Sequence, residues 1–182
     1  MEIAAKLNDA VQRYAHRIVE IARTKEEGHT LQPRQIQAFN RDRDTLEALR
    51  PHGARDLVNA FKQDGELLNE AADGRTQRTI RAMQAEAEIR QAPQLRAVRF
   101  VQRWQTLERQ HTGFDRNGDL QGQHNAKNSM GEMAKSLERD PQVESILRNR
   151  TRELGIVLDV GQSVGNTLLQ QLGIGRGRGL DL

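Results

Sequence analysis

Apolar residues recur at intervals of three and four along most of this chain, and this spacing limits the possible folds more than any other feature. Residues three and four apart share one face of an α-helix, whereas a half-buried strand alternates apolar and polar residues. No window shows sustained alternation, and aromatic residues make up 3% of the chain. The sequence therefore predicts an all-α fold. The first stripe of this kind consists of Ile3, Leu7, Val11, Tyr14, Ile18 and Ile21.

Glycine-containing breaks predict where the long helices end. The breaks are Gly28, the pair Asp73-Gly74 and the segment Thr112–Gly118, which has the composition of a turn. They predict four long helices, near residues 3–27, 33–72, 75–111 and 119–154.

Prolines predict further breaks inside these segments, because a proline disfavours helical geometry in the residue before it. We expect an interruption at residues 50–53 and a kink at Pro93. Asp140 followed by Pro141 matches an N-cap residue with proline at the first helical position, so a new helix should start there. Trp104 lies on the apolar stripe of its helix and should be buried in the core.

The composition favours slender helices with much exposed surface, since 36% of the residues are hydrophobic and 29% are charged. A last amphipathic segment covers residues 156–172, and alternating glycine and arginine follow it. The sequence thus predicts an elongated antiparallel four-helix bundle over residues 1–172, with an extra C-terminal helix or hook. Residues 173–182 should form a flexible basic tail.

Positive charge is concentrated in two parts of the chain, although the net charge is only +3. Residues 75–116 contain nine basic and four acidic residues, and residues 148–182 contain five and three. Such surfaces bind acidic proteins or phosphates, but an arginine-rich helix face that is simply solvated has the same composition. The predicted partner-binding residues are Arg96, Arg99, Arg103, Arg109, Arg148, Arg150, Arg152, Arg176 and Arg178.

No motif for catalysis, metal binding or cofactor binding is found in the sequence. There is no cysteine, the five histidines have no metal-site spacing, and the phosphate-binding glycine loops are missing. Asp115, Asn117 and Asp119 begin like a calcium loop, but the required glycine and glutamate are replaced by Leu120 and Ala126. The chain is therefore predicted not to be an enzyme, and to need neither metal nor cofactor.

Two strings resemble the C-terminal region of TraA-type relaxases of alphaproteobacterial conjugative plasmids. They are RTQRTIRAMQAEAEIRQAPQLRAVRFVQRWQTLERQ, which begins at Arg75, and SMGEMAKSLERDPQVESILRNRTRELGI, from Ser129 to Ile156. The closing GRGRGLDL is also similar to the basic, glycine-rich ends of that family. The resemblance is specific over about residues 70–182 and is limited to helical character before that.

The resemblance implies a terminal module similar to the Bep intracellular delivery (BID) domain. In such domains, a hooked antiparallel four-helix bundle and a positively charged tail serve as a type IV secretion signal, and a coupling ATPase is the receptor. The family's nicking and unwinding activities do not carry over. The single tyrosine, Tyr14, lies in an amphipathic stripe without a histidine triad, and the chain has no phosphate loop.

We therefore expect a non-catalytic translocation signal of a conjugative relaxase, which delivers the protein and its attached DNA to a recipient cell. It would be cytoplasmic in the donor bacterium and would pass through the type IV secretion system without inserting into a membrane. The alternative is a nucleic-acid-binding accessory module of the relaxosome, in which the same arginines make weak contacts with phosphates.

Overall fold

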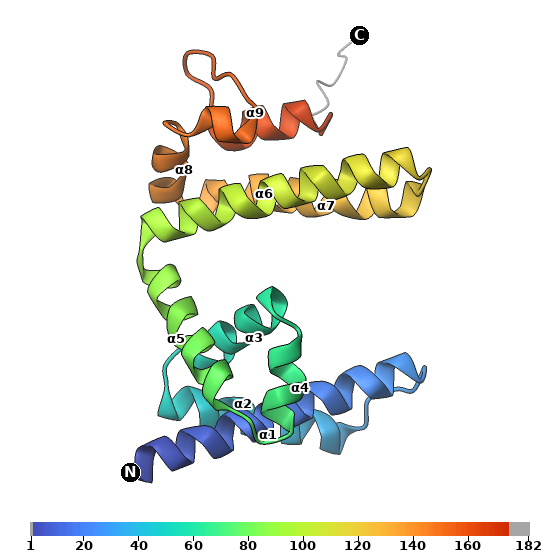
Figure 1. Ribbon diagram of the computed structural model, residues 1–182, viewed down its shortest axis with the longest axis vertical. Helices are drawn as coiled ribbons and strands as arrows, with labels where there is room; N and C mark the ends of the chain where they lie inside the picture. The colour runs from blue at the N-terminus through green and yellow to red at the C-terminus, as the bar shows by residue number, and fades with distance from the viewer. Residues whose placement is uncertain (1, 175–182) are drawn as a thin grey trace. The chain divides into compact units, whose positions relative to one another are not determined.

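The computed structural model describes residues 2–174, and every regular element in that range is a helix (Figure 1). The all-α prediction is confirmed. The α-helices are α1 (Glu2–Glu26), α2 (Pro33–Leu49), α3 (Gly53–Gln63), α4 (Glu66–Ala72), α5 (Gln77–Gln91), α6 (Pro93–Arg116), α7 (Leu120–Ser136), α8 (Pro141–Leu147) and α9 (Val164–Gln171). Two short 3₁₀ helices, η1 (Leu137–Arg139) and η2 (Thr151–Leu154), flank α8.

The chain divides into two compact units, one ending at Gln91 and the other beginning at Ala92. Each unit has its own buried apolar core. The helix expected over 75–111 is broken at this boundary, where Ala92 is extended with φ −106° and ψ 109°. The cause is Pro93, whose ring disfavours helical geometry in the preceding residue. Pro93 thus ends one helix and starts another, where the sequence predicts a kink within a single bundle.

In the first unit, α1 packs against α2 and α4, while α3 packs against α5. Its core is formed by apolar side chains from all five helices, and Tyr14 of α1 lies against Phe39 of α2 with ring centroids 5.3 Å apart. The fully buried larger side chains are Val11, Leu46, Leu57 and Met83.

The long helical segment expected over 33–72, with one interruption, is divided twice and forms α2, α3 and α4. The predicted interruption at residues 50–53 is confirmed: His52 is left-handed with φ 64°, and the Glu47 carboxylate accepts the N–H groups of His52 and Ala54 at 2.7 and 2.9 Å. The second break is at Asp64, whose backbone is extended, and no nearby proline predicts it.

Ion pairs between helices fix the arrangement of the first unit. The Arg90 guanidinium of α5 donates to both carboxylate oxygens of Asp56 in α3, at 3.0 and 3.1 Å, and Asp56 is completely buried. The bond to Asp56 raises the pKa of Arg90. Arg17 of α1 donates to the buried Asp42 of α2 at 3.0 Å. A buried carboxylate needs such a partner, since desolvation of an unpaired charge is costly.

In the second unit, α6 and α7 form an antiparallel hairpin (Figure 1). The turn expected at residues 112–118 is wrong in extent, since α6 continues through Arg116 and the reversal takes place at residues 117–119. Asp119 caps α7 by accepting the N–H of Gly122 at 2.8 Å. Thr112 and Gly113 therefore belong to the last turns of α6 rather than to a loop.

The rest of the second unit folds against this hairpin, with α8 and η2 on α6 and with α9 on α7. The predicted start at Asp140-Pro141 is confirmed, because the Asp140 carboxylate accepts the N–H of Val143 at 3.3 Å. The last helix begins at Val164, later than expected, after a loop that follows Gly155. Of the predicted tail, residues 175–182 lie outside the described residues.

Trp104 lies in the core of the second unit, as the sequence predicts, and has no exposed surface. Its ring stacks on Phe100 with centroids 6.1 Å apart. Its Nε1 is buried without a hydrogen-bond partner among the described residues. The fully buried larger side chains of this core are Trp104, Leu147, Leu154, Val164 and Leu168.

Candidate interaction surface of the second unit

The predicted partner-binding arginines that the structure describes all belong to the second unit. Arg96, Arg99, Arg103 and Arg109 lie on α6. The others lie in the segment that follows α8: Arg148 is the C-cap residue of α8, Arg150 precedes η2, and Arg152 lies in η2. Arg176 and Arg178 are outside the described residues.

Arg96 takes part in a structural ion pair and is not an exposed binding group. Its Nε and Nη2 donate to Oδ2 and Oδ1 of Asp140 at 2.8 and 3.2 Å, which joins α6 to the start of α8. Both side chains are partly buried, at 26% and 31% exposure. The bond from Arg96, more than the bond from the Val143 N–H, lowers the pKa of Asp140.

Arg148 and Arg150 also bind within the chain. Arg150 donates to both carboxylate oxygens of Glu153 at 2.7 Å, and this bond raises the pKa of Arg150 and lowers that of Glu153. Arg148 donates to the carbonyl of Gln162 at 3.1 Å, in the loop before α9. These arginines order the segment between α8 and α9, which the sequence alone did not indicate.

Glu144 of α8 makes a structural contact in this segment that the sequence does not indicate. Its Oε1 accepts the N–H of Val164 at 2.6 Å and its Oε2 accepts the N–H of Gly165 at 3.3 Å. These N–H groups are in the first turn of α9 and have no partner inside the helix. Ser163 adds a local cap by accepting the N–H of Asn166 at 3.1 Å. A serine before an apolar run predicts the local cap, but no pattern predicts the distant carboxylate.

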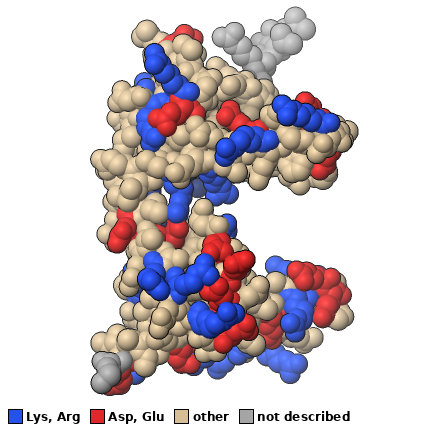
Figure 2. All heavy atoms as spheres, viewed as in Figure 1, with Lys and Arg blue, Asp and Glu red and all other residues tan. Residues whose placement is uncertain are grey.

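From Gln102 to Arg116, the outward face of α6 carries basic and neutral polar side chains without an acidic one, whereas the exposed Leu95 and Val98 lie on this face nearer the start of the helix. At 100° per residue, this face contains Arg103, Arg109 and Arg116, which are exposed and form no ion pair with any described residue. The only bond of Arg109 in this range is to Thr106 Oγ1 at 3.3 Å. Exposed neutral residues on the same face are Gln102, Thr106 and Gln110. On the face of the molecule that Figure 2 displays, basic and acidic side chains lie next to each other in several places.

An open groove of about 560 Å³ runs along the C-terminal half of α6. Arg109 and Arg116 lie on either side of Gly113 along the helix, and Glu108 supplies one carboxylate to the lining. The sequence identified Arg109 but missed Arg116, because residues 112–118 were interpreted as a turn. The groove is lined by Gln105, Glu108, Arg109, Thr112, Gly113 and Arg116.

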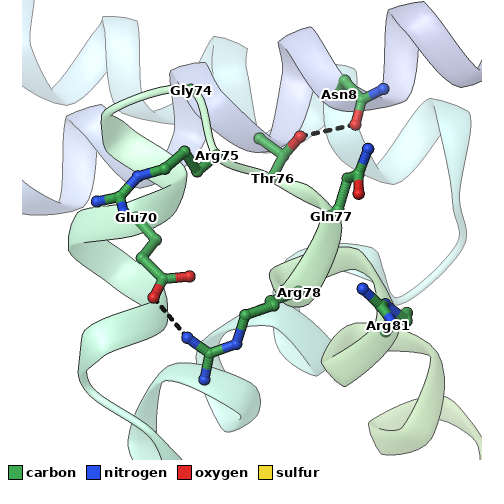
Figure 3. A pocket seen from close by; sticks show the side chains of 8 residues that line it. All are labelled: Asn8, Glu70, Gly74, Arg75, Thr76, Gln77, Arg78 and Arg81. Atoms are coloured by element: carbon green, nitrogen blue, oxygen red, sulfur yellow. Dashed lines mark hydrogen bonds and ion pairs between the residues drawn. The ribbon is translucent and has the colours of Figure 1, made fainter.

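A second cleft, of about 680 Å³, lies in the first unit, where α1, α4 and the start of α5 meet (Figure 3). Its polar groups largely bind one another. Thr76 donates to Asn8 at 2.7 Å, and Arg78 donates to Glu70 and, at 3.1 Å, to Asp64. The charge of Arg78 is therefore neutralised within the fold, whereas Arg81 forms no ion pair with a described residue. Its lining residues are Asn8, Glu70, Gly74, Arg75, Thr76, Gln77, Arg78 and Arg81.

Within residues 2–174, no group of three or more histidine, aspartate and glutamate side chains is arranged to hold a metal ion. The same range contains no helix that is both long and apolar enough to span a membrane. Comparisons with protein-family models, with curated proteins and with solved structures find no match to this chain.

Proposed function

We propose that this chain is a non-catalytic translocation signal of a conjugative relaxase, recognised by the coupling ATPase of a type IV secretion system. In this proposal the helical units and the basic C-terminal end together carry the attached protein, with its DNA, into a recipient cell. The antiparallel four-helix bundle with a hook that the resemblance implies is part of the same proposal.

The observation that carries this proposal is the position of the string that resembles TraA-type relaxases. The string from Ser129 to Ile156 covers the C-terminal half of α7 and all of η1, α8 and η2. Seven of its residues belong to the buried core of the second unit: Met130, Ala134, Leu137, Val143, Leu147, Leu154 and Ile156. A string of this kind that supplies a core supports a folded recognition module more than a linker.

The character of the surface also supports recognition of a partner protein. The clefts of both units are open and lined mainly by polar residues, which suits recognition of a macromolecule better than capture of a small molecule. Exposed ion pairs each contribute less than about 1 kcal/mol and are screened by salt. We therefore expect binding to the coupling ATPase to be modest in affinity and to weaken as salt increases.

Binding of the purified chain to a purified coupling ATPase, at about 0.15 M salt, tests this proposal. We expect binding that the double variant Arg176→Glu, Arg178→Glu weakens. The double variant Arg34→Glu, Arg55→Glu has the same charge change on exposed residues of α2 and α3, so it is a matched control that should bind normally. Absence of binding by the wild-type chain, or an equal loss in both variants, would count against a receptor-specific signal.

A further inference from the structure

We propose that the groove around Gly113 on α6 binds the phosphodiester backbone of double-stranded nucleic acid. This inference is independent of translocation. It rests on three features of α6: a glycine that the fold does not require, two flanking arginines without ion pairs, and an outward face without acidic side chains.

Gly113 is the most informative of these features. A glycine inside a helix destabilises it by about 0.5–1 kcal/mol relative to alanine. Here a Cβ atom would meet nothing within 4 Å, and φ is not in the left-handed region. Gly122 and Gly165 differ, since a Cβ would lie 2.5 Å from Phe114 or 2.8 Å from the Ala134 carbonyl. Packing therefore explains these two glycines but not Gly113, whereas close approach of a ligand to the backbone would explain it.

Arg109 and Arg116 flank this glycine on the same side of α6. They are seven residues apart, or about 10 Å along the helix axis at 1.5 Å per residue, so both guanidinium groups can reach one ligand. Neither forms an ion pair with a described residue. Guanidinium groups bind phosphate oxygens in a bidentate manner. Thr112 and Gln105 add polar groups to the same lining, and the carboxylate of Glu108 limits the net positive charge.

The rest of the outward face extends this site along the helix. Arg103 lies six residues before Arg109 and about 120° from it around the helix, and Gln102, Thr106 and Gln110 are neutral hydrogen-bonding residues in the arc between them. Cations and neutral polar groups spread over residues 102–116 of α6 fit a repeating phosphate backbone. An acidic protein offers the same charge but not this repeat, so we favour nucleic acid over a protein partner.

The absence of aromatic lining residues selects double-stranded over single-stranded nucleic acid. Tyr14 and Trp104 are buried in the two cores, and no aromatic residue lines the groove. Single-stranded binding sites usually stack bases on aromatic side chains. A site without them contacts phosphates only, so binding should be independent of sequence and strongly dependent on salt.

Fluorescence anisotropy with the full chain and a labelled DNA duplex of about 20 base pairs, from about 0.05 to 0.2 M salt, tests the proposal. Three phosphate contacts predict a slope of log K against log salt of about −2.7, since each contributes about 0.9. The double variant Arg109→Gln, Arg116→Gln should reduce the slope by about 1.8 and weaken binding at least tenfold at low salt. The charge-matched control Arg34→Gln, Arg55→Gln should bind within a factor of two.

A glycine variant distinguishes binding at this groove from binding through the overall positive charge, because it leaves the charge unchanged. Gly113→Ala should raise the melting temperature, because alanine favours helix. It should also weaken duplex binding at least threefold, because the added methyl group blocks the close approach of the phosphate to the backbone at this position. A stabilised variant with unchanged affinity would show that the phosphate does not contact the backbone at Gly113. An equal loss in the arginine double variant and its control would overturn the site as a whole. Binding of poly-glutamate as tight as that of the duplex, at equal total charge, would overturn it in favour of an acidic protein partner.

Discussion

The carboxylate of Glu144 lies 2.6 Å from the backbone nitrogen of Val164 and holds the first turn of α9 from another helix. Val164 is completely buried, so its N–H group cannot turn to water for a partner. Glu144 also contacts the Arg148 guanidinium at 3.7 Å, and Arg148 donates to the loop before α9. This one residue therefore connects α8, the loop and α9, the last helix before the C-terminal end.

Replacing Glu144 should loosen α9. Glu144→Ala removes a cap from two N–H groups, and loss of an N-cap destabilises a protein by about 0.5–2 kcal/mol. Urea unfolding measures this loss, and faster hydrogen exchange at Val164 and Gly165 should place it in α9. Glu138→Ala is the control on an exposed residue of η1, and should change stability by less than about 0.5 kcal/mol. Equal stability of both variants would show that the contact between Glu144 and the first turn of α9 does not stabilise the fold.

The ion pair between Arg96 and Asp140 predicts a pH dependence. Because the folded-state pKa of Asp140 is below its ordinary value of 3.8, the pair contributes stability above that pH and loses it as the pH falls further. Asp140→Asn keeps an N-cap residue but removes the charge. The wild type should therefore melt at a higher temperature than the variant at neutral pH, and the difference should shrink below about pH 4. A difference that stays constant from pH 7 to pH 3 would contradict this.

The volume of the Trp104 side chain should contribute more to the stability of the second unit than its indole N–H does. Trp104→Ala should cost about 3–5 kcal/mol, as for other large aromatic residues in cores. Trp104→Phe keeps a ring against Phe100 and removes the unpartnered Nε1, so it should cost less than half as much. Denaturant unfolding of both variants measures this, and a loss for phenylalanine as large as that for alanine would contradict it.

Gly165 permits the close approach of α9 to α7. A Cβ atom there would lie 2.8 Å from the Ala134 carbonyl, which is backbone and cannot move aside cheaply. Gly165→Ala should thus destabilise the second unit by about 1–3 kcal/mol. The matched variant Gly113→Ala should instead stabilise it by about 0.5–1 kcal/mol, because its Cβ would be in open space. Thermal unfolding compares the two, and the same sign for both would contradict this packing.

The parts of the fold that local sequence patterns control could be predicted. The end of α1 near Gly28, the start of α8 at Asp140 and the burial of Trp104 each depend on residues a few positions apart. The site was predicted only in part. The sequence indicates Arg109, but it predicts Gly113 to be a turn residue, since glycine inside a helix is unfavourable.

Contacts between distant residues could not be predicted. Nothing near Asp56 in the sequence indicates that it is buried against Arg90, 34 residues later. From the sequence, Arg96 and Arg148 are candidate binding residues. Only the structure shows that each forms an ion pair with a carboxylate of the same chain. The division into two units likewise depends on tertiary contacts, although Pro93 marks its position.

A transfer assay tests the central claim most directly. The chain is fused to the C-terminus of a reporter recombinase in a donor cell with a matching type IV system, and recombination is counted in recipients. We predict transfer above that of the unfused reporter, and reduced transfer for Arg176→Glu, Arg178→Glu without a change in melting temperature. If transfer equals that of the unfused reporter, while the chain binds duplex DNA tightly at about 0.15 M salt, the secretion proposal is wrong and an accessory nucleic-acid-binding module replaces it.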